Sequence, residues 1–415
     1  MKSAFTFTLL NALLIIASAA KIGHVITFRS PTLYPESFTY NPNSDNFIVG
    51  GTRHQKILSI SATGEAQTLL SDSDLPANSS FLGVAVDRRR NILLACIHNH
   101  HQFNALAAYD LQSGRRIFLT PLILPNGENQ NLIAQVTEKI KIRPAAANDV
   151  AVDYSGNAYV TNSDGDFIWK VDVNGDASIF SKSEVYKSHT VDVTVDYHKC
   201  GLNGIVYIPL GYLLVVQSNT GKMYKVNVDN GETETVNLNK DLTAADGIAV
   251  RSDGVVLVVS QYKVYYIKSE NNWEDGVVFD EIALDVEGFA TAVTIGDKKR
   301  VYVLYGHIME GIMGNGNRQE FSIVEIEEEE YKEKAQWYWS QCFSAYALDV
   351  ILVLANGRTC LFVSLDERRQ NSIQRQLQGQ AISRNAVVIF HQTNVPKCLC
   401  KNAVICNRRD EYEKA

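Results

Sequence analysis

Short runs of alternating hydrophobic and polar residues, separated by turn signals, recur along most of the chain. The stretch AANDVAVDYSGNAYVTN, residues 146–162, shows the pattern in full. Residues 150–154 alternate, a turn at Ser155-Gly156 follows, and a second strand is predicted over residues 158–161. Alternation with a period of two residues is typical of a half-buried β-strand. The pattern therefore predicts an all-β fold built from hairpins.

The same unit of four predicted strands, joined by glycine-containing turns, repeats along the chain. Successive units lie mostly about 40–60 residues apart, and they begin near Glu36, Leu82, Asn148, Asn203, Asp246 and Phe289. Repeats of four strands in about 40–50 residues are typical of a β-propeller, in which neighbouring blades cover faces that one blade cannot bury alone. Because no linker separates the units, a six-bladed β-propeller is favoured over two packed sandwiches.

The segment KIGHVITF, residues 21–28, precedes the first unit and is expected to add a strand that closes the ring onto the last blade. A run of charged residues, EIEEEEYKEK, over residues 325–334, reads as a solvated linker that ends the propeller. We therefore expect three parts: a leader over residues 1–20, the propeller over 21–335, and a divergent, poorly ordered tail over 336–415.

One repeat position carries oxygen-bearing side chains in several blades. In a propeller the innermost strand of each blade starts at one mouth of the central tunnel, so residues at this position converge there. The position is occupied by Glu36, Gly83, Asn148-Asp149, Asn203, Asp246 and, less closely aligned, Phe289. Asn and Asp also favour the turns before strands, which explains one such residue but fits poorly with four blades out of six.

Carboxylates gathered without a cation would repel one another and lose their hydration. An all-oxygen set without His or Cys suits a hard divalent cation. Calcium is favoured over magnesium, because ligands from separate blades lie at adaptable distances. The sequence therefore predicts a calcium site at the tunnel mouth.

Several motifs resemble the senescence-marker-protein/gluconolactonase family over about residues 21–330, in particular its plant branch described as calcium-dependent phosphotriesterase-like. They are FNALAAYDL, NAYVTNS, CGLNGIVY, GYLLVVQSNTGKMYKV, ADGIAV and YVLYGHIMEGIMGN. The resemblance implies that Glu36, Asn203 and Asp246 hold the metal, and that Asn148 faces water or substrate. It further implies hydrolysis of a lactone or other ester, with Asp246 as a general base. Asn148 is the residue that matches the family, so the role of its neighbour Asp149 stays open, and one alternative is that it only ties down backbone at the turn.

Two departures from the family pattern bear on the substrate. Sugar-lactone hydrolases of the family carry an Arg two residues before the third-blade Asn, where this chain has Ala146, and Arg143 lies too early to replace it. A Pro usually follows the first-blade Glu closely, whereas Ser37-Phe38 follow here. The metal prediction is unaffected by these changes, but the prediction of a sugar-lactone substrate is not supported.

Two other functions stay open. A calcium-stabilised propeller without activity would serve as an interaction platform. A strictosidine-synthase-like enzyme would need a Glu on the inner strand of the sixth blade, where Thr291-Ala292 stand, and Glu287 lies a few residues early, at an expected turn. A structural calcium would be closed over by protein ligands, whereas a catalytic one would be open to solvent.

The first 20 residues have a single early Lys2, an apolar run and small residues before Lys21, the pattern of a cleaved secretory signal peptide. The secretory pathway is therefore expected (extracellular, endoplasmic reticulum lumen or vacuole), and the sequon at Asn78 becomes a candidate glycosylation site. After cleavage we expect no membrane-spanning segment. The formal net charge of −7, without a basic stripe, argues against nucleic-acid binding.

Other features of the sequence have simpler explanations. The cluster HNHHQF, residues 98–103, is expected in an exposed loop of the second blade, with His98 kept as a remote candidate at the tunnel. The seven cysteines leave open whether Cys96 pairs with Cys200, and the CLC run at residues 398–400 lacks the spacing of a zinc site.

Overall fold

The computed structural model describes residues 22–99, 103–122, 146–312 and 316–327, together with five strands between residues 350 and 407. The chain divides into two compact units, residues 1–327 and 328–415, which are described separately. The predicted leader over residues 1–20 lies outside the described residues. No helix in the described ranges is long and apolar enough to cross a membrane.

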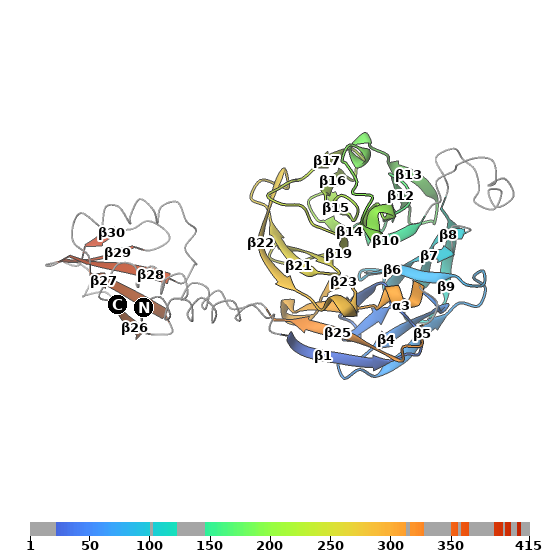
Figure 1. Cartoon of the computed structure of the whole chain (residues 1–415), viewed down its shortest axis with the longest axis horizontal. Coiled ribbons are helices and arrows are strands. Elements are labelled where there is room, and N and C mark those ends of the chain that lie inside the picture. Colours follow the sequence, from blue (N-terminus) through green and yellow to red (C-terminus); the bar gives the residue numbers. More distant parts are fainter. Residues whose placement is uncertain are drawn as a thin grey trace, which may run out of the picture. The chain divides into compact units, whose positions relative to one another are not determined.

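The first unit is a ring of six antiparallel blades, which confirms the predicted six-bladed β-propeller (Figure 1). From the axis outwards, blade 1 contains β2 (Phe38–Asn41), β3 (Asn46–Val49), β4 (Lys56–Ile60) and β5 (Ala66–Ser71), and blade 2 contains β6 (Ser80–Asp87), β7 (Ile92–Asn99), β8 (Phe103–Asp110) and β9 (Arg116–Pro121). Blade 3 contains β10 (Ala147–Val152), β11 (Ala158–Asn162), β12 (Ile168–Val171) and β13 (Ala177–Ser181), and blade 4 contains β14 (Leu202–Ile208), β15 (Tyr212–Gln217), β16 (Met223–Asn227) and β17 (Thr233–Thr235). Blade 5 contains β19 (Ala245–Val250), β20 (Val256–Ser260), β21 (Lys263–Lys268) and β22 (Asp275–Ala283), with the short β18 (Asn237–Leu238) parallel to β22 at its outer edge.

Blade 6 is built from both ends of the propeller sequence. It contains β23 (Ala290–Ile295), β24 (Val301–Tyr305) and β25 (Glu320–Ile326), and its outermost strand is β1 (Ile22–Arg29). Strand β1 pairs antiparallel with β25, with Phe28 opposite Phe321. This pairing confirms the predicted closure of the ring by the first strand.

Short helical turns occupy some of the connections between strands. They are η1 (Glu184–Lys187), η2 (Asp196–Lys199), η3 (Val286–Gly288), η4 (Asp297–Lys299) and α3 (Ile308–Ile312). The loops that precede inner strands, together with α3, lie on the face of the ring where the inner strands begin.

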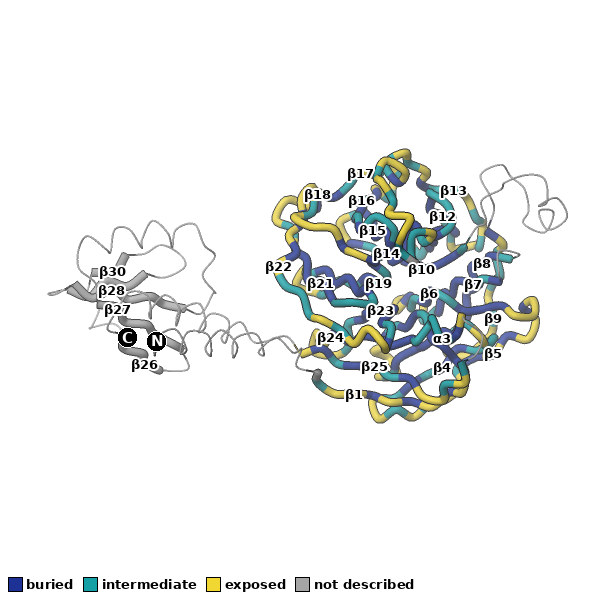
Figure 2. Tube along the Cα trace, viewed as in Figure 1, coloured by how far each residue is buried: buried dark blue, intermediate teal, exposed yellow. Residues whose placement is uncertain are grey.

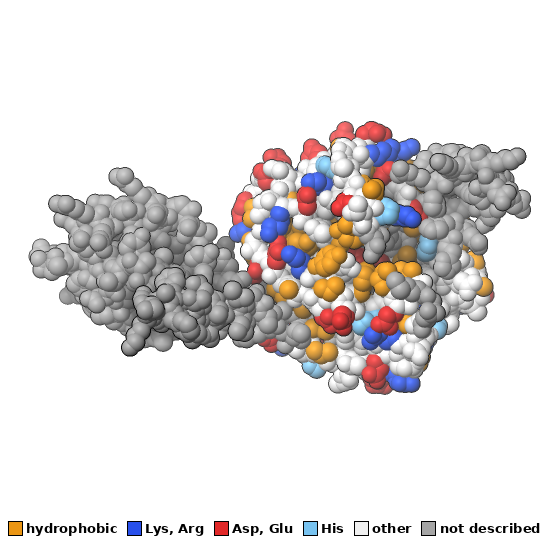
Figure 3. All heavy atoms as spheres, viewed as in Figure 1, with side chains coloured by type: hydrophobic (Ala, Val, Ile, Leu, Met, Phe, Trp, Pro, Cys, Tyr) orange, Lys and Arg blue, Asp and Glu red, His pale blue; other side chains and the backbone are white. Residues whose placement is uncertain are grey.

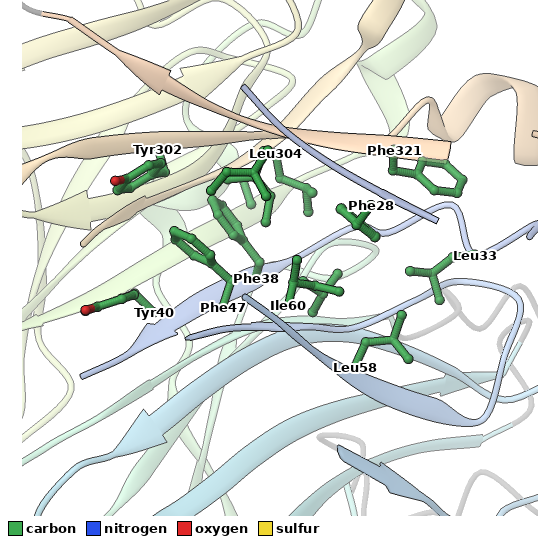
Figure 4. Close-up of a cluster of buried hydrophobic side chains, with 14 of the residues drawn as sticks. Phe28, Leu33, Phe38, Tyr40, Phe47, Leu58, Ile60, Tyr302, Leu304 and Phe321 are labelled. Atoms are coloured by element: carbon green, nitrogen blue, oxygen red, sulfur yellow. The ribbon is translucent and has the colours of Figure 1, made fainter. Parts of the chain in front are cut away.

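The core of the propeller consists of hydrophobic clusters between the blades. Six clusters of buried side chains occur in the described residues, one at each of the six interfaces between neighbouring blades. Figure 4 shows the cluster between blades 6 and 1, where the ring of Phe28 lies near that of Phe321 and the ring of Phe47 lies against that of Tyr302. Figure 2 shows buried positions along the interior of the ring and exposed positions at the connecting loops. Each blade is therefore covered on both faces by its neighbours.

The inner strands share a local irregularity where they begin. The register with the next strand shifts in five of the six blades, between Phe81 and Val84, Ala147 and Val150, Leu202 and Ile205, Ala245 and Ile248, and Ala290 and Ala292. A β-bulge of this kind leaves residues unpaired and redirects their side chains. The bulges lie at the same end of these five blades and turn these residues towards the axis.

Glycine within the bulge lets neighbouring blades approach closely. A Cβ atom at Gly83 would lie 2.4 Å from Cα of Asp149, and one at Gly204 would lie 2.3 Å from the carbonyl oxygen of Asp246. Both distances are too short for non-bonded atoms, so a side chain at either position would push adjacent blades apart. The absence of a side chain, rather than conformational freedom, is what these positions require.

The second unit contains a five-stranded sheet among its described residues. Its strands, in spatial order, are β26 (Val350–Ala355), β27 (Arg358–Ser364), β28 (Ala386–Gln392), β29 (Val395–Leu399) and β30 (Ile405–Asn407). These strands fall within the segment expected from the sequence to be a poorly ordered tail. The poor order of residues 336–415 in solution stays a prediction.

We expect Phe28→Ala to lower the free energy of unfolding by about 3–5 kcal/mol, because it removes a ring from the interface that closes the propeller. The ring of Phe28 is 1% exposed and lies 6.1 Å from that of Phe321. Val25→Ala, on the same strand but 45% exposed, should cost less than about 1 kcal/mol. Urea denaturation of both variants checks this, and equal losses would show that the closing strand contributes little.

Candidate functional site at the tunnel mouth

Five side chains from five blades form a narrow neck in the central tunnel. Below them lies a cavity of about 360 Å³ that follows the inner strands, and above them lies a cavity of about 660 Å³ at the mouth. The residues that line both cavities, called the neck from here on, are Glu36, Asn148, Asn203, Asp246 and Thr291. The structure thus brings together all four side chains that the sequence placed at the metal and substrate site.

The repeat position needs correction in two blades. The sequence alignment placed Gly83 and Phe289 there, but Leu82 and Thr291 are the residues that face the axis. The reason is the bulge, since its first residue faces the tunnel mouth and its second packs against the next blade. Phe289 lies two residues earlier and lines the mouth cavity.

Thr291 is the functional candidate that sequence reasoning missed. A signal for it exists in the sequence: in each blade the residue that faces the tunnel stands two positions before a large hydrophobic residue of the inner strand. The six triplets are ESF, LGV, NDV, NGI, DGI and TAV, beginning at Glu36, Leu82, Asn148, Asn203, Asp246 and Thr291. Aligning the sixth blade on Val293 would therefore have selected Thr291.

The acidic side chains of the neck are held in an environment that disfavours their charge. Burial raises the pKa of Asp246 to about 8, and it raises the pKa of Glu36 well above its usual range. The negative charges of Asp246 and Asp149 raise the pKa of Glu36 further. A cation at the neck would reverse this balance, because it stabilises the ionised carboxylates.

Asp149 uses its carboxylate within the protein. Its Oδ1 accepts a hydrogen bond from the backbone N–H of Val150 at 2.8 Å, and its Oδ2 accepts one from Ile205 at 3.1 Å. These bonds lower its pKa, but burial outweighs them and raises it to about 6. The side chain of Asp149 therefore joins the bulges of blades 3 and 4. A structural role at this turn was the alternative that the sequence raised for it.

The Asn203 amide is fixed by a hydrogen-bonded chain. Its Nδ2 donates to Oγ of Ser218 at 3.0 Å, and that hydroxyl donates to the carbonyl oxygen of Ala245 at 2.6 Å. The amide also lowers the pKa of Asp246, partly opposing the effect of burial. Blade 4 thus presents a pre-oriented amide beside the carboxylate of blade 5.

Two oxygen atoms of the neck are buried without a hydrogen-bond partner among the described residues. They are Oδ1 of Asn148 and Oγ1 of Thr291, in residues that are 9% and 3% exposed. A buried polar atom left unsatisfied costs about 1–3 kcal/mol, so such atoms usually mark the place of a water, ion or ligand.

The residues present fit a hard cation. No group of three His, Cys, Asp or Glu side chains within the described ranges is arranged to hold a metal. The neck instead combines two carboxylates with two amide oxygens and a hydroxyl, which is a donor set suited to calcium. The unsatisfied amide oxygen of Asn148 and the two carboxyl groups with raised pKa values are groups that a cation would stabilise.

The sixth blade carries no carboxylate at the neck. Thr291 occupies the inner-strand position, while Glu287 lies in the exposed turn η3 and lines neither cavity. A strictosidine-synthase-like arrangement, with a Glu on this strand, is therefore not formed.

Other candidates from the sequence are placed as follows. His98 lies at the end of strand β7 rather than in a loop, lines the mouth cavity, and its Nδ1 is 3.0 Å from Oδ1 of Asn104. Cys96 and Cys200 are both free thiols, so they do not pair. Asn78 is exposed in the loop before β6, as glycosylation would require.

The chain matches no protein-family model, and no curated protein matches it. Among solved structures it is similar to the major allergen Mala s 1 of Malassezia sympodialis, at 16% identity and a TM-score of 0.60, over 74% of this chain and 96% of that one. A gluconolactonase from Xanthomonas campestris aligns at 13% identity and a TM-score of 0.49, over 76% and 93% of the two chains. Virginiamycin B lyase from Staphylococcus aureus aligns at 10% identity and a TM-score of 0.44, over 73% and 99%. The structural neighbours are six-bladed propellers that include gluconolactonases, and at these identities the likeness shows the fold alone.

We expect the calcium-free protein to lose stability as the pH rises from about 4 to 8. The pKa of Asp246 in the folded state is about 8 against an ordinary value of 3.8, so folding favours its protonated form. The stabilising contribution is full below about pH 4 and is lost as the pH rises through 8. Urea denaturation with a chelator should show a fall of a few kcal/mol that Asp246→Asn flattens. Asp229→Asn, at an exposed turn, should leave the slope unchanged, and a flat profile in the parent protein would contradict the prediction.

Proposed function

We propose that the protein is a calcium-dependent hydrolase of a lactone or other ester, with its reaction centre at the neck. The observation that carries the proposal is the convergence of Glu36, Asn148, Asn203 and Asp246 from four blades, with Oδ1 of Asn148 unsatisfied and with two half-buried acidic groups whose charges interact. Buried ionisable groups with strongly shifted pKa values, facing a cavity, are typical of functional sites.

Calcium would be held by the carboxylates of Glu36 and Asp246 and by the side-chain oxygen of Asn203. When bound, it supplies Lewis-acid polarisation of an ester carbonyl and lowers the pKa of a coordinated water. The mouth cavity of about 660 Å³ gives a small-molecule substrate access to this position, so the site is open on one side. A purely structural ion would instead be closed over by protein ligands.

The protein side chains have separable tasks in this proposal. Asp246 is placed to accept the proton of the attacking water, and its carboxylate is held in position by the fixed amide of Asn203. Asn148 binds the substrate or the water through its unsatisfied amide. The Thr291 hydroxyl is a further donor facing the same place, where it can stabilise negative charge that develops on the carbonyl oxygen.

The departures from the family pattern at Ala146 and Ser37 argue against a sugar lactone as the substrate. The alternative of a calcium-stabilised interaction platform remains the contrasting outcome. It predicts stabilisation by calcium without turnover.

We further propose that the protein acts in the secretory pathway. The signal-peptide pattern of the first 20 residues and the exposed position of Asn78 support this location. Calcium is abundant in these compartments, so a site built from few charged ligands can be occupied there.

The hydrolysis proposal is tested with aryl esters and lactones, comparing the purified protein with calcium and with a chelator. We expect turnover that depends on calcium and falls at least about 100-fold in Asp246→Asn, because that change removes both a ligand charge and the base. Asp149→Asn is the contrasting variant: it should lower stability more than the rate per folded molecule. If calcium raises the melting temperature but no turnover is seen, the hydrolase proposal is overturned. The protein would then be a calcium-stabilised interaction platform.

The location proposal predicts that Asn78→Gln abolishes a glycan carried by the secreted protein. Expression in a eukaryotic host should give a band that shifts on deglycosylation, and the variant should run at the shifted position. A parent band insensitive to deglycosylation, or an intact leader on N-terminal sequencing, would contradict the proposal.

A further inference from the structure

The walls of the mouth cavity differ in character from the neck beneath them. Hydrophobic residues from three blades line it: Leu82 from blade 2, Ala244 from blade 5, and Phe289, Ile308 and Ile312 from blade 6. Figure 3 shows hydrophobic side chains gathered around the centre of the propeller, on the face where α3 is seen in Figure 1. The carboxylates of Glu36 and Asp246 and the amides of Asn148 and Asn203 lie at the floor, while these apolar groups lie above them. The walls also include four polar or charged residues, Arg53, His98, Tyr197 and Gln261.

Three hydroxyl groups in the walls, those of Thr52, Ser80 and Ser218, are already engaged within the protein, while Tyr197 and Gln261 are further polar residues of the lining. Thr52 Oγ1 donates to the carbonyl oxygen of Tyr34 at 3.0 Å, and Ser80 Oγ donates to that of Thr52 at 2.6 Å. Ser218 Oγ donates to the carbonyl oxygen of Ala245 at 2.6 Å. Since a hydroxyl has one O–H to donate, these three side chains have no further O–H group to offer a ligand.

Among the residues that the structure describes, one arginine lines the mouth, and it is also held by the protein. The Arg53 guanidinium donates to the carbonyl oxygen of Gly311 and lies over the Tyr34 ring, 4.9 Å from its centroid. It is therefore fixed as part of the rim between blade 1 and α3. This arrangement differs from an arginine that reaches into a cavity to bind a polyol.

Phe289 is held in place at a cost in backbone strain. Its φ angle of 48° lies in the left-handed region, which bulky residues rarely adopt. The preceding Gly288 packs against Tyr305, where an added Cβ would lie 2.2 Å from the Tyr305 ring. A strained residue that persists because its surroundings enforce it is often found at a functional site. Here the strain belongs to an aromatic wall residue of the mouth cavity.

We propose, building on the function above, that the mouth cavity binds an alkyl or aryl group of a lactone or ester substrate and discriminates against polyhydroxylated sugar lactones. The apolar walls gain from covering hydrocarbon. The hydroxyl groups of a sugar lactone would lose water in the cavity and find few partners, which a binding site rejects strongly. The floor then presents the neck to the ester group of the bound molecule.

The first test compares kcat/KM for γ-butyrolactone, γ-octalactone, γ-dodecalactone and glucono-δ-lactone, using the full chain with calcium. The Michaelis constant should fall about threefold per added methylene until the cavity is filled. Glucono-δ-lactone should be the poorest substrate. Preference for glucono-δ-lactone would overturn this inference while leaving the hydrolase proposal standing.

Variants with matched controls locate the effect in the cavity. Phe289→Ala and Ile312→Ser should each reduce kcat/KM for γ-dodecalactone about tenfold or more, with little change for γ-butyrolactone. The controls are Phe279→Ala, on the outer strand β22, and Leu210→Ser, at the β14–β15 turn, which are 40% and 75% exposed and line neither cavity. An equal loss for both lactones, or an equal loss in the controls, would overturn the assignment.

A binding measurement separates this inference from the catalytic one. Decanol should displace fluorescent anilinonaphthalene sulfonate from the calcium-free protein, and Phe289→Ala should weaken the displacement about tenfold. Binding without turnover of any lactone would overturn the hydrolase proposal and retain the ligand class. The assignment of the mouth cavity to an alkyl or aryl group would be overturned if decanol displaced no bound anilinonaphthalene sulfonate. It would also be overturned if Phe289→Ala left the displacement unchanged.

Discussion

The propeller depends on mutual burial of its blades. A four-stranded meander has two apolar faces and cannot cover either by itself, so every blade requires a neighbour on both sides. The six clusters between blades meet this requirement only if the ring is closed, and closure rests on the pairing of β1 with β25. Loss of one interface would therefore expose two blades rather than one.

The same requirement explains why the neck can hold acidic groups together. The inner strands are pressed against one another so closely that Gly83 and Gly204 leave no room for a Cβ. Between blades 3 and 4, the carboxylate of Asp149 accepts a hydrogen bond from the backbone N–H of Ile205 and keeps the two adjacent bulges in register. A rigid ring can keep Glu36 and Asp246 in mutual repulsion, because their separation would require the blades to move. The interblade packing thus stabilises an arrangement that is unfavourable on its own and suited to a cation.

Much of this architecture could be predicted from the sequence. Alternation and repeat spacing predicted six blades, and the recurrence of Asn and Asp at one repeat position predicted that Asn148, Asn203 and Asp246 would meet Glu36. What failed was the register in blades 2 and 6, because a bulge changes which residue faces the axis and leaves no mark in a simple alternation. The sequence alignment therefore selected Gly83 and Phe289, whereas Leu82 and Thr291 are the residues that face the axis.

The mouth cavity could not be predicted for a different reason. Most of its walls come from loops and from α3, whose position is set by tertiary contacts such as that of Arg53 with Gly311 rather than by local pattern. His98 illustrates the same limit, since its place at the end of β7 depends on how far that strand extends. Sequence periodicity therefore locates the floor of the site better than its walls.

The origin of the sixth blade has a consequence for synthesis of the protein. Strand β1 ends at Arg29, but its partner β25 begins at Glu320, so about 300 residues must be translated before the two can pair. At about 5–20 residues per second this takes on the order of 15–60 s. Throughout that time Ile26 and Phe28 belong to a strand with an open edge, the kind of segment that pairs with other chains. A nascent chain of this protein should therefore need protection at its first strand until its last blade emerges.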